Sequence, residues 1–239
     1  MELVETQVTL DDLALKHGTD KASNGHNYCP QYEQYLGHLR NTQPTLLELG
    51  VYEGASLRMW RDYFPRGTIV GLDINPLVDE IDGVDIHVGD QASYEDIETQ
   101  LAIYQGFDVI IDDASHLSSL TIKSFELLYP HLKPGGLYVI EDLHSSYHDW
   151  FYGNAEACFN PDGQLPKRRG AEGRLETAMQ FCKRLADEVN FKPGAEVHNH
   201  KWQLFPEKYW RGYHLESVQF FYNICFIRKH PEATWTATI

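Results

Sequence analysis

The sequence predicts an α/β fold built on a seven-stranded, mostly parallel sheet, with an antiparallel C-terminal strand and helices on both faces. From residue 45, apolar segments of strand length alternate with amphipathic segments of helical length. The strand segments are continuously apolar rather than alternating, which is typical of parallel strands covered on both faces. Residues 217–229 then predict two short strands that pair in antiparallel fashion.

The segments before the sheet predict a helical and loop cap over residues 1–44, followed by the main domain over 45–239. The cap holds a helical pattern at 10–16, a polar loop rich in Gly and Asn, and a second helix at 31–39. A break in the pattern after Asp142 predicts a lid insertion at about 143–173. The remaining elements are expected strands at 45–50, 68–74, 84–90, 107–113 and 136–142, and expected helices at 54–64, 93–104, 120–132 and 176–190.

Composition excludes several classes of partner. The 239 residues carry a net charge of −15, which argues against a nucleic-acid backbone as the ligand. No apolar run approaches the roughly 18 residues of a membrane span, and the N-terminus lacks the features of a signal peptide. The four cysteines are scattered, which favours reduced thiols. We therefore expect a cytoplasmic protein that binds neither nucleic acid nor membrane.

Acidic residues follow each of the first five predicted strands. Ligands of open α/β sheets bind outside the carboxyl ends of the strands, so these side chains are expected at one edge of the sheet. Acids gathered along one edge repel each other, and a purely structural protein gains nothing from them. The pattern predicts a binding site formed by Glu48, Asp73, Asp90, Asp112, Asp113, Glu141 and Asp142.

The turn after the first strand has the pattern ExGxxxG, with Glu48, Gly50 and Gly54. A dinucleotide-binding turn would be GxGxxG, and an acid at this place would repel a phosphate. The glycines allow close approach of a ligand that has no phosphate there. Asp73 lies 25 positions after Glu48 and could accept hydrogen bonds from ribose hydroxyls. The alternative is that Gly50 is only a turn glycine and Asp73 only a helix cap.

A second cluster combines Asp113 with Glu141 and Asp142 from the neighbouring predicted strand. Three convergent carboxylates require a hard cation, and oxygen ligands favour Mg²⁺, with Mn²⁺ or Ca²⁺ as alternatives. His116 follows Asp113 by three positions and is a candidate general base. The alternative for His116 is a local hydrogen bond to a carboxylate at the start of a helix.

The turn and the acids of the second and third strands resemble the Rossmann-like class I S-adenosylmethionine (SAM)-dependent methyltransferases. The resemblance implies that Asp73 holds the ribose and that Asp90, with Gln91, lies near the adenine. Asp112 is expected to face the cofactor or to support the turn. The loop that contains Asp20, Lys21, His26 and Tyr28 is expected either to fold over the cofactor or acceptor or to be a surface loop.

Most of the chain resembles one group within this class, the metal-dependent macrocin/mycinamicin sugar O-methyltransferases of macrolide biosynthesis. The matching segments are HGTDKASNGHNYCPQYEQYL, LLELGVYEGASLRMW, GLDINP, FDVIIDDASH, LKPGGLYVIEDLHSSY and SVQFFYNICFIRK. By this resemblance Asp113, Glu141 and Asp142 would bind Mg²⁺, and His116 would be the general base. The acceptor would be a sugar diol of a glycosylated natural product. The extra N-terminal domain of some members has no counterpart here, which leaves open whether the chain forms a homo-oligomer.

The proposed reaction explains why both a metal and a base are expected. An aliphatic hydroxyl has a pKa near that of water, about 15.7, and a bound metal ion lowers such a pKa. Mg²⁺ lowers it less than Zn²⁺ does, so a base such as His116 is still needed. Two other functions remain open, namely a metal-dependent catechol or phenol O-methyltransferase and a non-catalytic SAM-binding subunit.

Overall fold

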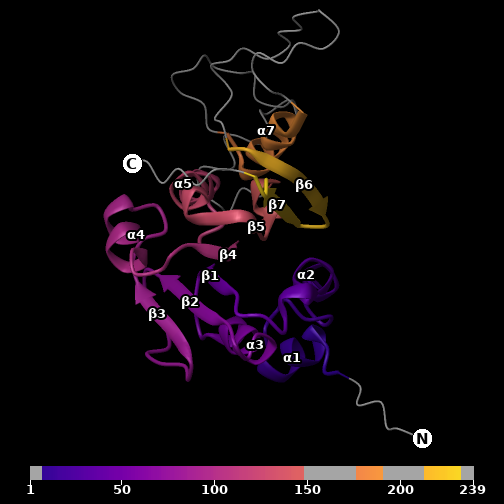
Figure 1. The fold of residues 1–239 in the computed structure, drawn as a ribbon, viewed down its shortest axis with the longest axis vertical. Coiled ribbons are helices and arrows are strands. Elements are labelled where there is room, and N and C mark those ends of the chain that lie inside the picture. Colours follow the sequence, from indigo (N-terminus) through magenta and orange to yellow (C-terminus); the bar gives the residue numbers. More distant parts are fainter. Residues whose placement is uncertain (1–6, 148–175, 191–212, 233–239) are drawn as a thin grey trace, which may run out of the picture. The chain divides into compact units, whose positions relative to one another are not determined.

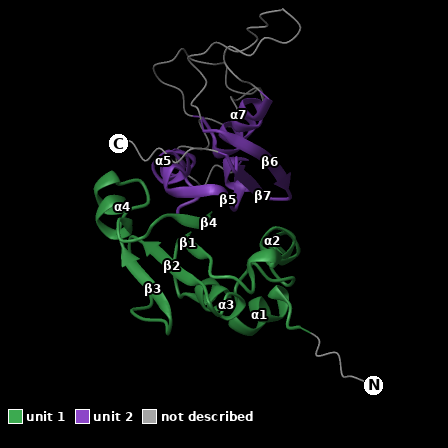
Figure 2. Cartoon of the chain, in the orientation of Figure 1, with its two compact units in different colours: residues 1–114 green, residues 115–239 purple. Residues whose placement is uncertain are grey.

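The computed structural model describes residues 7–147, 176–190 and 213–232, and it confirms the predicted α/β class (Figure 1). Seven strands form a mixed sheet in which one strand near the C-terminus runs antiparallel to the others. The chain divides into two compact units, residues 1–114 and 115–239 (Figure 2).

The first unit carries four parallel strands in the order β3-β2-β1-β4. Its first helix begins where Thr9 and Asp12 form a capping box and ends at Gly18 in the left-handed conformation. The elements are α1 (Leu10–His17), α2 (Cys29–Leu36), η1 (Gly37–Leu39), β1 (Thr45–Leu49), α3 (Ala55–Tyr63), β2 (Thr68–Asp73), β3 (Val84–Val88), α4 (Tyr94–Leu101) and β4 (Phe107–Asp112).

The register of these strands brings their carboxyl ends together. Leu49, the last residue of β1, pairs with Leu72 of β2 on one side and with Asp112 of β4 on the other. β1 and β4 are buried almost continuously along their length, as expected for parallel strands that are covered on both faces. The residues that follow the strands therefore meet at one edge of this part of the sheet.

The second unit contains three strands, and β7 runs antiparallel to both β5 and β6. The prediction of an antiparallel pair at the C-terminal end is therefore confirmed, and its turn is formed by Tyr222 and Asn223. In α7, Phe181 and Leu185 are fully buried. The elements are α5 (Ser118–Leu128), η2 (Tyr129–His131), β5 (Leu132–Ile140), η3 (Leu143–Tyr147), α7 (Ala178–Asn190), β6 (Leu215–Phe221) and β7 (Ile224–Lys229).

Several expectations have no structural counterpart. Residues 148–173 of the predicted lid lie outside the described residues, and the boundary between residues 44 and 45 stays a prediction.

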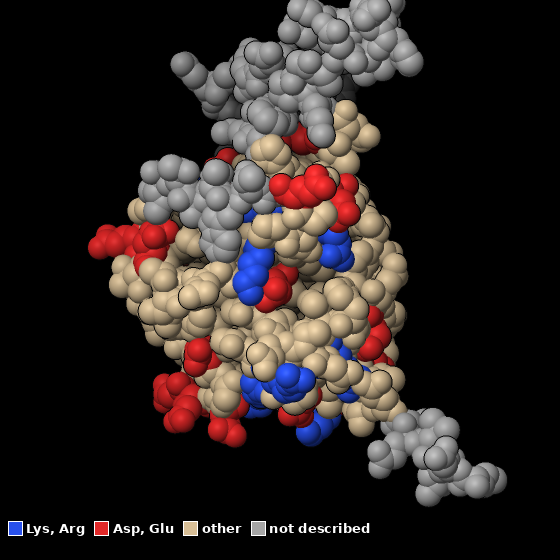
Figure 3. Space-filling model, viewed as in Figure 1, with Lys and Arg blue, Asp and Glu red and all other residues tan. Residues whose placement is uncertain are grey.

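Cys29, Cys182 and Cys225 are buried free thiols. None of the helices in the described ranges has the length and apolar character to cross a membrane. On the face drawn in Figure 3, acidic and basic side chains of the described residues are interspersed.

Candidate active site

The turn after β1 requires glycine at Gly50. Its φ is +91°, and a Cβ atom there would lie 2.2 Å from the backbone oxygen of Asp113. The Gly50 N–H donates to the Leu72 oxygen at 2.9 Å, and the Asp113 N–H donates to the Leu49 oxygen at 3.1 Å. The turn is thus held between β2 and the end of β4. The close approach of the Asp113 backbone leaves no room for a side chain at Gly50, and contact of Gly50 with a cofactor stays a prediction.

Asp73, at the end of β2, is tied to the same turn. Its Oδ2 accepts hydrogen bonds from the N–H groups of Val51 at 2.7 Å and Tyr52 at 3.0 Å. Its Oδ1 accepts one from Asn75 N–H at 2.8 Å. Partial burial would raise the pKa of Asp73, but these backbone donors outweigh it and lower the pKa. Asp73 is therefore an ionised acceptor that orders the turn, and a carboxylate can accept further hydrogen bonds.

The residues expected near the adenine are connected to each other. Asp90 Oδ1 accepts a hydrogen bond from the Ala92 N–H at 2.8 Å, which closes the turn that leads to α4. The buried Gln91 donates from Nε2 to Oδ1 of the buried Asp112 at 3.3 Å. Asp112 thus connects β4 to the segment after β3. Contact of Asp90, Gln91 and Asp112 with a cofactor stays a prediction.

Glu48 and Asp113 share Lys21, a pairing that sequence reasoning did not predict. The Lys21 side chain is fully buried, with Nζ 2.5 Å from Asp113 Oδ2 and 3.3 Å from Glu48 Oε1. Ser56 also donates to Glu48 Oε2 at 2.8 Å. Burial raises the pKa of Glu48 to about 7, although the positive charge of Lys21 opposes the increase. Lys21 therefore supplies the positive charge that lies against Asp113 in this structure.

The loop that delivers Lys21 is compact. The Lys21 oxygen accepts hydrogen bonds from the N–H groups of Tyr28 at 2.9 Å and Cys29 at 3.3 Å, so the backbone folds back on itself. His26 N–H donates to the Asp20 oxygen at 2.6 Å. Lys21 and Tyr28 are both buried, so these two residues are not part of a solvated surface loop. The role of Tyr28 toward a cofactor stays a prediction.

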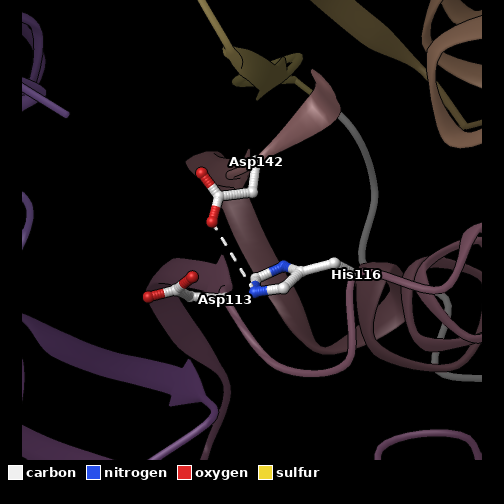
Figure 4. A group of neighbouring side chains, drawn as sticks. All are labelled: Asp113, His116 and Asp142. Carbon is white, nitrogen blue, oxygen red and sulfur yellow. Dashed lines mark ion pairs between the residues drawn. The ribbon is translucent and has the colours of Figure 1, made fainter. Parts of the chain in front are cut away.

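His116 and Asp142 face each other in the second unit (Figure 4). His116 Nε2 lies 3.6 Å from Asp142 Oδ2. Both residues have a positive φ, +55° for His116 and +53° for Asp142, which is uncommon for residues other than glycine. Such strain is frequent at functional sites. Asp113, also labelled in Figure 4, closes the first unit and precedes His116 by three positions.

Glu141 and Asp142 directly follow β5, as predicted, and both are buried. Asp142 also contacts a residue that sequence reasoning missed, because the Asn223 Nδ2 atom donates to its Oδ1 at 2.9 Å. The only sequence signal for Asn223 was its place in a predicted hairpin turn, where asparagine is common for conformational reasons alone. Metal binding by Asp113, Glu141 and Asp142, and base catalysis by His116, stay predictions.

Comparison with known proteins agrees with the fold and identifies related proteins. Residues 47–143 match the model of a family described as a methyltransferase domain. The chain is 40% identical over 229 residues to mycinamicin VI 2''-O-methyltransferase of Micromonospora griseorubida, an alignment that covers 92% of this chain and 52% of the relative. It is 32% identical over 234 residues to demethylmacrocin O-methyltransferase of Streptomyces fradiae, covering 92% of this chain and 53% of the relative.

A solved structure of the methyltransferase MycE from the mycinamycin pathway, in complex with Mg and SAH, has a TM-score of 0.74 to this chain at 31% identity. The match covers 94% of this chain and 54% of MycE. A further MycE structure holds Mg, SAH and mycinamycin VI, with a TM-score of 0.72 and 29% identity, and covers 98% of this chain and 58% of that one. The chain thus spans about half the length of the relatives that it matches. The resemblance inferred from the sequence motifs is confirmed.

Proposed function

Because residues 47–143 form a methyltransferase domain, we propose that the chain is a SAM-dependent, Mg²⁺-dependent O-methyltransferase. The acceptor we propose is a hydroxyl of a sugar, with a neighbouring hydroxyl, on a glycosylated natural product. One observation carries the proposal. The chain, which is 40% identical to a sugar O-methyltransferase, combines a turn after β1 that is bonded to Asp73 with acidic residues after β4 and β5.

The first unit supports the cofactor half of the proposal. Gly50 and Gly54 both have a positive φ and let the turn after β1 pack tightly, and Asp73 presents an ionised carboxylate beside this turn. We propose that Asp73 binds the ribose hydroxyls, and that Asp90 with Gln91 lies near the adenine. Glu48, Asp112 and Tyr28 would complete the cofactor side. SAM, when bound, supplies an electrophilic methyl group on a positively charged sulfur.

The donor atoms at the strand ends fit a hard cation. Carboxylate oxygens dominate the two candidate ligand groups in the described residues, Asp113 with His116 and Asp142, and Glu48 with Asp113 and Glu141. Oxygen ligands favour Mg²⁺ or Mn²⁺ over softer metals. We propose that Asp113, Glu141 and Asp142 hold the ion. Mg²⁺, when bound, supplies Lewis acidity that lowers the pKa of an acceptor hydroxyl.

His116 is the proposed base. Its Nε2 atom lies 3.6 Å from Asp142 Oδ2, and an imidazole nitrogen can accept a proton from an acceptor hydroxyl. The acceptor hydroxyl proton would pass to Nε2 as the oxygen forms its new bond to the methyl carbon. The electron pair of the broken carbon–sulfur bond stays on sulfur, so charges and atoms balance.

The organisation of the chain is part of the proposal. Residues 1–44 would cap the site through the Lys21 loop, and residues 143–173 would form a lid that selects the acceptor. We place the enzyme in the cytoplasm, which agrees with the absence of a disulfide among the described cysteines Cys29, Cys182 and Cys225. Assembly into a homo-oligomer is compatible with the proposal and is not needed for it.

The test is mass spectrometry of reactions that contain SAM and a panel of glycosides, polyols and catechols, with Mg²⁺ or with EDTA. We expect a 14 Da gain on a glycoside acceptor that EDTA abolishes and added Mg²⁺ restores. Undiminished transfer in EDTA would remove the metal from the mechanism. Methylation of catechols alone would favour the catechol-type alternative. SAM binding by calorimetry without transfer to any acceptor would identify a binding subunit instead.

A further inference from the structure

The turn between β6 and β7 brings an asparagine to the proposed metal ligand Asp142. The Asn223 Nδ2 atom donates to Asp142 Oδ1 at 2.9 Å, although 81 positions separate the two residues. We propose that Asn223 is a positioning residue that orients the Asp142 carboxylate for the metal ion. This inference rests on the proposed function, since it presupposes that Asp142 binds metal.

Asn223 holds three consecutive residues after β5. Its side chain bonds to Asp142, its backbone oxygen accepts from the Leu143 N–H at 3.0 Å, and its Oδ1 accepts from the His144 N–H at 2.7 Å. Oδ1 also contacts the Nδ1 atom of the His144 ring. The backbone N–H of His144 can only donate, so it fixes which end of the amide carries the oxygen. The amide nitrogen must then face Asp142, which makes the contact a true hydrogen bond.

These contacts set the direction of the Asp142 carboxylate. Its backbone lies in the left-handed region at φ +53°, a conformation that costs roughly 1–2 kcal/mol in residues other than glycine. The hydrogen bond to Asn223 occupies Oδ1, and Oδ2 is directed toward His116 Nε2 at 3.6 Å (Figure 4). Each carboxylate oxygen carries two lone pairs, so both oxygens of Asp142 keep capacity for a metal ion beside these two partners.

The chemistry of an amide suits this role. Asn223 donates a hydrogen bond but carries no charge, so it orients the carboxylate without competing electrostatically with a divalent cation. A lysine or arginine at the same place would lower the affinity of Asp142 for metal. Residues that orient metal ligands in this way typically change metal affinity 10–100-fold when they are replaced.

A purely structural role makes a different prediction. The Leu143 N–H bond uses the Asn223 backbone oxygen and survives loss of the side chain, whereas the contacts with His144 are lost together with the amide. Asn223 has a φ of +67°, which glycine adopts without strain. Asn223→Gly therefore removes the amide and keeps the turn. If the side chain is a positioning group, the change should affect metal binding far more than folding.

The experiment is a calorimetric titration of the full chain with Mg²⁺, together with thermal unfolding in EDTA. We expect Asn223→Gly to weaken Mg²⁺ binding about 10–100-fold, with little change in the unfolding temperature in EDTA. Tyr222→Ala, at the 89% exposed neighbouring position of the turn, should leave both quantities unchanged. His144→Ala should weaken binding less than Asn223→Gly, because it leaves the bond to Asp142 intact.

Several outcomes would overturn the inference. Wild-type Mg²⁺ affinity in Asn223→Gly would do so, as would an equal loss in His144→Ala, which would assign the effect to the histidine. If the unaltered chain binds no Mg²⁺, the proposed function fails first and the inference falls with it. A measurement on the unaltered chain adds a test that does not depend on the folding of a variant. The Asn223 side-chain amide resonances should shift when Mg²⁺ is added, and unchanged resonances would also overturn the inference.

Discussion

Strained backbone conformations mark individual residues of the candidate site. His116 and Asp142 both have a positive φ, and each belongs to a segment that directly follows a strand end. Evolution retains such conformations where surrounding contacts hold them and a function benefits. Here the benefit we infer is that the imidazole and the carboxylate face each other at 3.6 Å.

His116→Ala tests the role of the base. With a sugar acceptor we expect turnover to fall about 10²–10⁴-fold, because an aliphatic hydroxyl depends on a base for proton removal. SAM affinity should not change, since the proposed SAM contacts lie elsewhere. Steady-state kinetics and calorimetry measure the two effects, and His38→Ala in η1 is the matched control at an exposed histidine. Turnover within a few-fold of wild type would contradict the assignment.

The turn between β1 and α3 is the element on which the proposed cofactor site depends. It contacts the chain after β4 so closely that a Cβ atom at Gly50 would overlap a backbone oxygen. Backbone atoms within a sheet cannot move aside as a flexible side chain can. The position of the turn is thus fixed by β2 on one side and by the end of β4 on the other.

Gly50→Ala should therefore be much more harmful than an ordinary replacement of a left-handed glycine. Gly18→Ala is the matched control, because Gly18 has a φ of +74° but its Cβ would meet nothing within 4 Å. In Gly18→Ala the free energy of unfolding should fall only by the cost of the left-handed backbone conformation, about 1–2 kcal/mol. In Gly50→Ala the free energy of unfolding, measured with urea, should fall further, and calorimetry should show no SAM binding. Similar losses in the two variants would show that the close approach is unimportant.

Most of the fold was predictable because the strands are apolar runs bounded by turn residues, and the acids that follow them are visible in the sequence. The partners of those acids were not. Lys21 lies 92 positions from Asp113, and Asn223 lies 81 positions from Asp142. A single sequence contains no information on such pairs, and lysine and asparagine in polar loops are usually solvated. Only the folded backbone brings them to the site.

At the scale of the whole molecule, the proposed roles divide between the two compact units. Residues 1–114 carry the proposed cofactor contacts and Asp113, and residues 115–239 carry His116 with Glu141 and Asp142. Each unit also has a buried lysine. Lys21 pairs with acids, whereas Lys229 donates to the backbone oxygens of Tyr129 at 3.2 Å and Leu132 at 2.6 Å.

Lys229 makes the stability of the chain depend on pH. Burial lowers its pKa from 10.5 to about 8, so between these values the unfolded chain holds a proton that the folded chain has released. The free energy of unfolding should therefore rise with pH in this window, by up to about 1.4 kcal/mol per pH unit from this group. Urea unfolding between pH 7.5 and 10 would show the increase in wild type and in the exposed control Lys183→Met. The same slope in Lys229→Met would refute the prediction.

The burial of Lys21 has a consequence for how the chain can be dissected. A fragment that begins at residue 45, where the sheet begins, would contain Glu48 and Asp113 but not the ammonium group that lies between them. Removing one partner from a buried charged cluster typically costs about 3–5 kcal/mol, a large share of the stability of a domain. The smallest fragment worth expressing, or grafting into a chimaera with a longer relative, must therefore start before Thr19 and retain the loop through Cys29.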